Sequence, residues 1–117
     1  MIALLLAVQD VGTRPTGIDV AASRSFEELQ ACVIAEMSEG GFVEPRAIEG
    51  GMAFDWFMPT PLGVKGKNIL LVEVVDRDGV RHMTIKYRRP FSRKIAVKRM
   101  REVVAVCEPL MDVTAIQ

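Results

Sequence analysis

The chain has 117 residues, of which 50% are apolar and 26% are charged, and its formal net charge is zero. A chain of this length forms one domain around a single core and is too short for two domains. The high apolar fraction excludes an intrinsically disordered protein.

The chain begins with an apolar segment, residues 1–8. A membrane-spanning helix needs about 20 apolar residues, so this segment is too short to span a bilayer. Two interpretations stay open. Either residues 1–22 are an atypical secretory leader that ends before Ser23, which predicts an exported protein in the periplasm or the medium, or residues 2–8 form an extra N-terminal strand of a cytoplasmic protein. In both cases we expect residues 10–24 to be an irregular linker.

A first helix is predicted over residues 26–38. Ser25 and Glu28 form a capping box, in which the serine hydroxyl accepts an amide of the first turn. Gly40 and Gly41 follow the helix as a stop signal. Apolar residues recur at helical spacing and predict one buried stripe: Phe26, Leu29, Val33 and Met37.

Three strands are predicted in the middle of the chain. Residues 52–58 alternate in the pattern of a strand, and the Pro- and Gly-containing segment 59–68 predicts a long loop. Residues 69–75 are apolar on both faces, which is typical of a central strand. Residues 76–79 have the composition of a hairpin turn, and residues 80–88 alternate again. The pattern therefore predicts a three-stranded antiparallel meander.

A second helix is predicted over residues 93–108, and it too has one apolar stripe. The expected fold is a single α+β domain over residues 23–117, with the order α-β-β-β-α and both helices packed on one face of the meander. The other face would leave Ala53 and Phe57 exposed. We expect residues 2–8 to cover that face as an extra strand, or a homodimer to form through it.

The two cysteines, Cys32 and Cys107, lie in the two predicted helices. They are too few and too dispersed for a structural zinc site. In an exported protein we expect them to form a disulfide, and in a cytosolic protein we expect two free, buried thiols.

The sequence does not indicate an enzyme. His82 is the only histidine and is expected on the solvated face of its strand, whereas both cysteines are expected to point inward, so a Cys–His pair is not predicted. Asp55 and Glu73 lie in neighbouring strands and are expected to be outward residues paired with basic side chains. With one histidine and no local cluster of ligands, we expect no metal and no cofactor.

The strongest local signal is basic. Residues 1–60 carry nine acidic residues and three arginines, residues 61–117 carry twelve basic residues and six acidic ones, and no acidic residue lies between Arg88 and Arg101. Basic residues also fill the first turn of the last helix, where the helix dipole favours acidic ones. We therefore expect an anion-binding surface at the end of the third strand and the start of the last helix, formed by Arg88, Arg89, Arg93, Lys94, Lys98 and Arg101.

Two interpretations of this basic surface compete. In one, it is a solvated face neutralised by carboxylates of the first helix, Glu27, Glu28, Glu36 and Glu39. In the other, the protein is a non-catalytic binding module that engages an anionic partner, either the surface of a protein or a small anion. Nucleic acid is the alternative partner, although the pI of 6.6 and the lack of a known nucleic-acid-binding motif argue against it.

Overall fold

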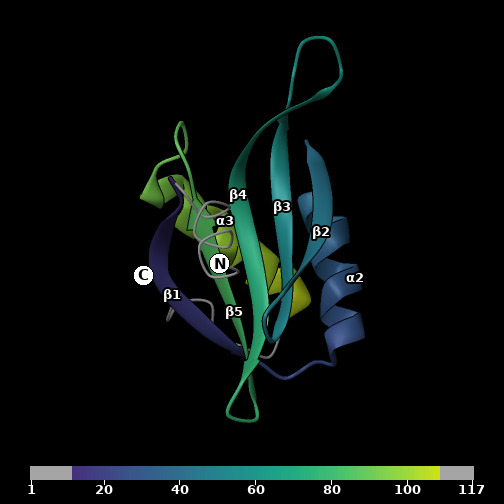
Figure 1. Cartoon of the computed structure of the whole chain (residues 1–117), viewed down its shortest axis with the longest axis vertical. Helices are drawn as coiled ribbons and strands as arrows, with labels where there is room; N and C mark the ends of the chain where they lie inside the picture. The colour runs from purple at the N-terminus through teal and green to yellow at the C-terminus, as the bar shows by residue number, and fades with distance from the viewer. Residues whose placement is uncertain (1–11, 109–117) are drawn as a thin grey trace, which may run out of the picture.

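A computed structural model describes residues 12–108 of the chain. These residues form β1 (Arg14–Ala22), α2 (Phe26–Met37), β2 (Phe42–Ile48), β3 (Gly51–Pro59), β4 (Lys65–Arg77), β5 (Val80–Tyr87) and α3 (Arg93–Cys107). The strands make one antiparallel sheet with the spatial order β1-β5-β4-β3-β2. Both helices lie against the same face of this sheet (Figure 1). The domain is therefore α+β, as expected, with the order β-α-β-β-β-β-α.

The two helices and the central meander were predicted correctly. Ser25 caps α2, since its hydroxyl accepts the Glu28 amide at 3.2 Å, and Ser92 caps α3 in the same way through the amide of Ile95 at 3.3 Å. The β4–β5 hairpin turns at Asp78 and Gly79, whose φ angles of 51° and 78° are those of a tight turn.

The predicted strand order was wrong at both edges of the sheet. Residues 14–22 were expected in an irregular linker but form β1, which pairs with β5. A register shift between Pro15 and Asp19 interrupts β1, and this hides its alternation. The extra strand expected at residues 2–8 lies outside the described residues. The expected cleavage before Ser23 stays a prediction, and it would remove β1 from the sheet.

At the other edge, β2 was not predicted. None of its residues is fully buried, and Pro45 lies in its middle, so it lacks the sequence pattern of a strand. An edge strand tolerates proline because one side of its backbone has no partner strand. The loop expected over 59–68 is also shorter than predicted, because β4 already begins at Lys65 and pairs there with Pro59.

The core lies between the sheet and the two helices. Phe54, Val72 and Ile85 project from the sheet toward the helices and are at most 1% exposed. A disulfide between Cys32 of α2 and Cys107 of α3 joins the two helices, with a Cα–Cα distance of 5.6 Å. The helix residues that fill the same core are Leu29, Val33, Met37, Ala96, Val97, Met100, Val103 and Val104.

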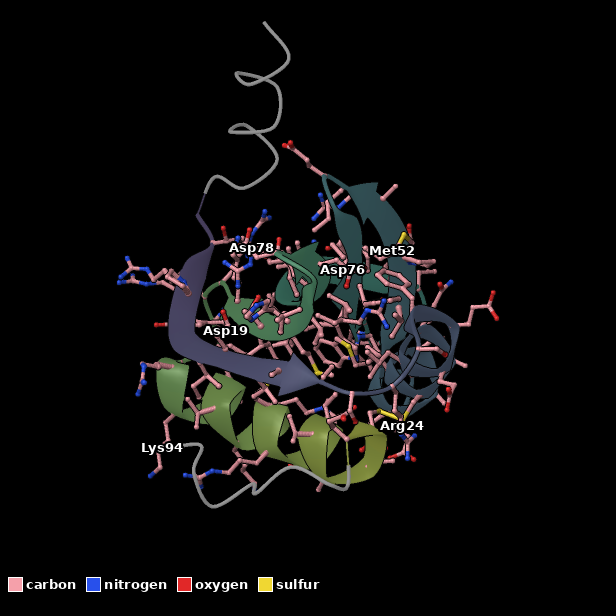
Figure 2. All side chains as sticks on the ribbon, turned by 90° about the horizontal axis from the view of Figure 1, so that it is seen from below. Asp19, Arg24, Met52, Asp76, Asp78 and Lys94 are labelled. Carbon is pink, nitrogen blue, oxygen red and sulfur yellow. A yellow bond between two sulfur atoms is a disulfide. The ribbon has the colours of Figure 1, made fainter. Side chains whose placement is uncertain are left out.

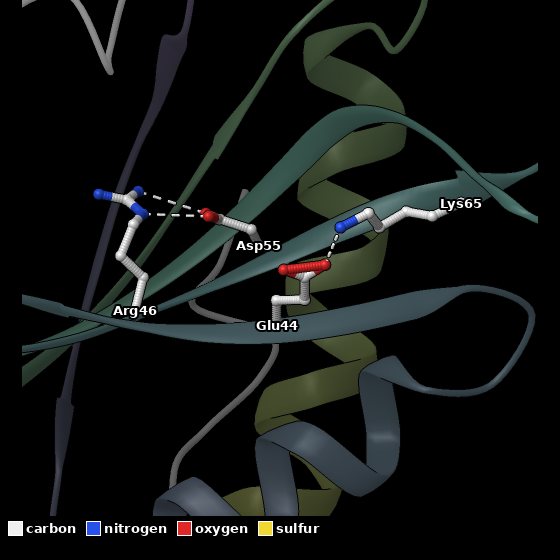
Figure 3. Close-up of polar contacts among 4 residues, drawn as sticks. All are labelled: Glu44, Arg46, Asp55 and Lys65. Carbon is white, nitrogen blue, oxygen red and sulfur yellow. Dashed lines mark hydrogen bonds and ion pairs between the residues drawn. The ribbon is translucent and has the colours of Figure 1, made fainter.

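The sheet face opposite the helices, here called the open face, carries several ion pairs. Arg46 donates two hydrogen bonds to Asp55, at 3.0 and 3.3 Å (Figure 3). Asp55 is only 7% exposed and Ala53 is fully buried, so the exposure expected for Ala53 was wrong, whereas Phe57 is half-buried. The expected homodimer through this face stays a prediction.

Two further ion pairs lie beside that of Arg46. Lys65 pairs with Glu44 and also lies 4.4 Å from the centroid of the Phe57 ring, which is half-buried (Figure 3). Lys86 pairs with Glu73 at 3.1 Å, as expected for outward residues of neighbouring strands.

Within the described part of the chain, no helix is both long and apolar enough to cross a membrane.

Candidate functional site

The connection from β5 to α3 is short and held by backbone hydrogen bonds. The Arg88 amide donates to the carbonyl oxygen of Ile69 at 2.9 Å, which extends the pairing with β4 by one residue. The Phe91 amide then donates to the carbonyl oxygen of Arg88 at 3.0 Å and closes a turn. Ser92 starts α3 directly afterwards. The basic residues of this connection therefore project from a defined backbone.

A cleft of about 860 Å³ opens beside this connection. Four of the side chains that line it are cationic, and none of the described residues that line it is acidic. The four cations come from different segments: Arg14 from the start of β1, Lys67 from β4, Arg89 from the connection and Arg93 from α3. We call this the basic cleft, and its remaining lining residues are Met58, Tyr87, Pro90, Phe91 and Ser92.

Arg93 forms one wall of the basic cleft and is fixed to the sheet. Its Nε donates to the backbone carbonyl oxygen of Thr16 in β1 at 3.0 Å. Thr16 is buried, and its hydroxyl donates to the carbonyl oxygen of Ile85 in β5 at 3.0 Å. The start of α3, the edge strand β1 and β5 are therefore held together on one side of the cleft.

Only two of the six basic residues predicted as a site line the basic cleft. Arg89 and Arg93 line the basic cleft, and Arg88 is half-buried at the end of β5. Lys94 and Arg101 are exposed on α3 and do not line the cleft, and Figure 2 shows Lys94 directed away from the sheet. Lys98 lines a second, smaller cavity.

Two residues of the basic cleft were missed at the sequence level. Arg14 lies in the segment predicted as a linker, although it pairs in register with Tyr87 at the end of β5. Lys67 was assigned to a loop, although it lies in β4. The turn residues Gly63 and Gly66 masked the start of that strand, and no local pattern around Arg14 pointed to a strand.

The basic residue that contacts a carboxylate of α2 is Arg99, which is not one of the six predicted site residues. Arg99 lies 3.6 Å from the Glu36 carboxylate, donates to the Glu36 carbonyl oxygen at 2.7 Å and pairs with Glu102 at 2.7 Å. In contrast, none of the carboxylates of the described residues lies within ion-pair distance of Arg89, Arg93, Lys94 or Lys98. The positive charge of the basic cleft is therefore left without an internal counter-charge in the described part of the chain.

A cavity of about 190 Å³ adjoins the basic cleft, because Phe91 lines both spaces. We call it the apolar cavity; its walls are Trp56, Leu70, Phe91 and Ile95, and its rim is Lys98, Arg99 and Glu102. The ring centroids of Trp56 and Phe91 are 5.9 Å apart. Trp56 also packs closely on Gly41, where a Cβ atom would lie 2.3 Å from Cε2 of the indole. Both aromatic rings are therefore held by their surroundings.

The groups considered for catalysis are engaged elsewhere. Both cysteines are in the disulfide and offer no thiol to His82, whose Nδ1 lies 2.7 Å from Oδ1 of Asp19. Asp55 and Glu73 are paired with Arg46 and Lys86. Among residues 12–108, no group of three or more His, Cys, Asp or Glu residues could hold a metal ion.

Comparison with protein-family models, with curated proteins and with solved structures gives no match. The interpretation of the site therefore depends on its own geometry and charge.

Proposed function

We propose that this domain is a non-catalytic binding module whose basic cleft binds an acidic segment of a partner protein. One observation carries the proposal: Arg14, Lys67, Arg89 and Arg93 converge on one cleft that no described acidic residue lines. Like charges that are held together repel one another, and an anion in the cleft relieves that repulsion. Bound carboxylates would thus be attracted by several cations at once.

The chemistry of the four cations supports carboxylates as the bound groups. Three of them are arginines, whose planar guanidinium groups bind carboxylates through two parallel hydrogen bonds. Arg14, Lys67 and Arg89 make no contact with a carboxylate of the described residues, so they are available to a partner. Lys94, Lys98 and Arg101 extend the positive surface along α3, where they increase the rate of encounter with an acidic partner.

Calorimetric titration with hexaglutamate tests the proposal. The chain allows two double variants with the same change of charge: Lys67→Ala/Arg89→Ala removes two cations of the cleft, and Lys94→Ala/Arg101→Ala removes two cations of α3 that line neither the cleft nor the apolar cavity. We expect the first variant to weaken binding about tenfold and the second less than about threefold. The wild-type affinity should fall as the salt concentration rises.

Two results would contradict the proposal. One is the absence of salt-sensitive binding of hexaglutamate to the wild type. The other is an equal loss in both double variants, together with tighter binding of a single-stranded oligothymidylate than of hexaglutamate. That second result would support the alternative partner, nucleic acid, which would follow the whole basic surface instead of the cleft.

A further inference from the structure

The basic cleft is continuous with a space of a different chemical character. Phe91 separates the two: it lines the basic cleft, and it also forms a wall of the apolar cavity with Trp56, Leu70 and Ile95. A segment bound in the cleft therefore passes directly beside an apolar hollow. Binding sites that anchor a partner commonly combine such an apolar pocket with a charged rim.

We propose, on the basis of the proposed function, that the acidic segment carries one large apolar side chain that enters the apolar cavity. The carboxylates on either side of that side chain would then lie along the basic cleft and against Lys98 on the rim of the cavity. The partner is thus a peptide segment in which a Phe, Leu or similar residue lies among acidic residues.

The size of the apolar cavity supports a single side chain. Its volume is about 190 Å³. An engineered apolar cavity of about 150 Å³ binds one benzene molecule, so this cavity has room for one ring or one branched aliphatic group. A long acyl chain would not fit in it.

The number of cations argues for a peptide over a simple fatty acid. A fatty acid has one carboxylate, whereas the basic cleft has four cations and the adjoining apolar cavity has Lys98 in its lining. One carboxylate would leave most of these charges unneutralised. An acidic peptide supplies several carboxylates and an apolar group in the same molecule.

The cavity walls also argue against a nucleotide base as the inserted group. A base has polar edges that need hydrogen-bond partners when buried. Among the wall residues the indole Nε1 of Trp56 is the one buried polar side-chain atom without a partner, and a single donor cannot satisfy the several polar edges of a base. Arg99 and Glu102 on the rim already pair with each other at 2.7 Å. An apolar side chain needs no hydrogen-bond partner when it is buried.

Ile95 provides an accessible wall that can be changed without disturbing the core. It is 45% exposed on the first turn of α3, although it lines the apolar cavity. Val106 on the same helix is 51% exposed and does not line the cavity, so it serves as a matched control. Replacing either residue with Asn removes an apolar side chain from the surface without changing the net charge.

Two peptides separate the apolar contribution from the electrostatic one: Glu-Glu-Phe-Glu-Glu and Glu-Glu-Ala-Glu-Glu. Binding is followed through the fluorescence of Trp56, the only tryptophan, and by calorimetry. We expect the Phe peptide to bind about tenfold more tightly than the Ala peptide and to shift the Trp56 emission. Ile95→Asn should reduce this preference to about twofold or less, whereas Val106→Asn should leave it unchanged.

Equal affinity of the wild type for the two peptides would overturn the inference and leave the proposed function standing, since both peptides would still bind through their carboxylates. Loss of the preference in Val106→Asn to the same extent as in Ile95→Asn would also overturn it. So would tighter binding of decanoate or of adenosine monophosphate than of the Phe peptide. Failure of both peptides to bind would instead contradict the proposed function itself.

Discussion

Arg93 in the first turn of α3 donates a hydrogen bond from Nε to the backbone carbonyl oxygen of Thr16 in β1, over 3.0 Å. This bond joins residues 77 positions apart in the sequence. It holds the edge strand β1 against the start of α3, and both elements contribute an arginine to the basic cleft. A residue that the sequence marked only as a binding residue thus also stabilises the fold.

Replacing Arg93 with Ala should therefore lower the free energy of unfolding, by about 1 kcal/mol, because the Thr16 carbonyl loses a charged donor. Lys94→Ala is the matched control: it removes a neighbouring positive charge that has no such bond, and its effect should stay within about 0.5 kcal/mol. Urea unfolding measures both values. Equal stability of the two variants would show that the bond contributes nothing.

The disulfide between Cys32 and Cys107 should account for a large part of the stability. The two cysteines are 75 positions apart, and closing a loop of that size in the unfolded chain is expected to stabilise the native state by roughly 4 kcal/mol. We expect Cys32→Ala/Cys107→Ala to unfold at a much lower urea concentration than the oxidised wild type. A reducing agent should destabilise the wild type and leave the double variant unaffected. Equal midpoints of oxidised wild type and double variant would refute this.

The Arg46–Asp55 pair on the open face should be sensitive to the loss of one partner. Asp55 is only 7% exposed, so Arg46→Ala leaves a nearly buried carboxylate without its main donor. We expect a loss of roughly 2 kcal/mol in the free energy of unfolding. Replacing both residues together should be less harmful than the sum of the single changes, because the pair is removed with both its charges. Additive effects in a double-mutant cycle would argue against coupling.

The lowered pKa of Asp76 predicts that the free energy of unfolding depends on pH. The hydrogen bond from Arg81 lowers the pKa of Asp76 below its usual value and raises the pKa of Arg81. A carboxyl group with a lowered pKa in the folded state contributes stability above its unfolded pKa of about 4. That contribution is lost as the pH falls through the lower folded pKa.

The variant Asp76→Asn tests this dependence. It should be less stable than the wild type at about pH 7, and the difference should shrink at about pH 2.5, because that pH lies well below the unfolded pKa of Asp76. Thermal or urea unfolding at the two pH values measures the difference. Asp78, labelled with Asp76 in Figure 2, is the control, because it lies in the hairpin turn directly after β4 and forms no ion pair with a described residue. A pH-independent difference for Asp76→Asn would contradict the assignment.

The parts of the fold that the sequence predicted share one property: their buried residues recur at a regular spacing. The stripes Leu29–Val33–Met37 and Val97–Met100–Val104 identify the two helices, and strict alternation identifies β5. Both edge strands escaped prediction because only one side of an edge strand is paired and few of its residues are buried. In β1 only Thr16 and Val20 are buried.

Only part of the candidate site was predicted, because a local sequence pattern does not show which distant residues lie together. Arg89 and Arg93 were found because they are neighbours in a basic run of the sequence. Arg14 joins them only because β1 pairs with β5 in a register that places Arg14 opposite Tyr87. Such a register depends on contacts between distant segments, and a local pattern does not contain it. The basic cleft is thus a tertiary feature.

Mapping of backbone amide shifts by NMR during titration with hexaglutamate tests the location of the site most directly. The basic cleft predicts that the largest shifts occur at Arg14, Lys67 and the segment 89–93, and that Lys67→Ala/Arg89→Ala needs about ten times more hexaglutamate to reach shifts of the same size. Shifts that instead run along Lys94, Lys98 and Arg101, or that appear around His82 on the open face, would contradict a binding site in the cleft.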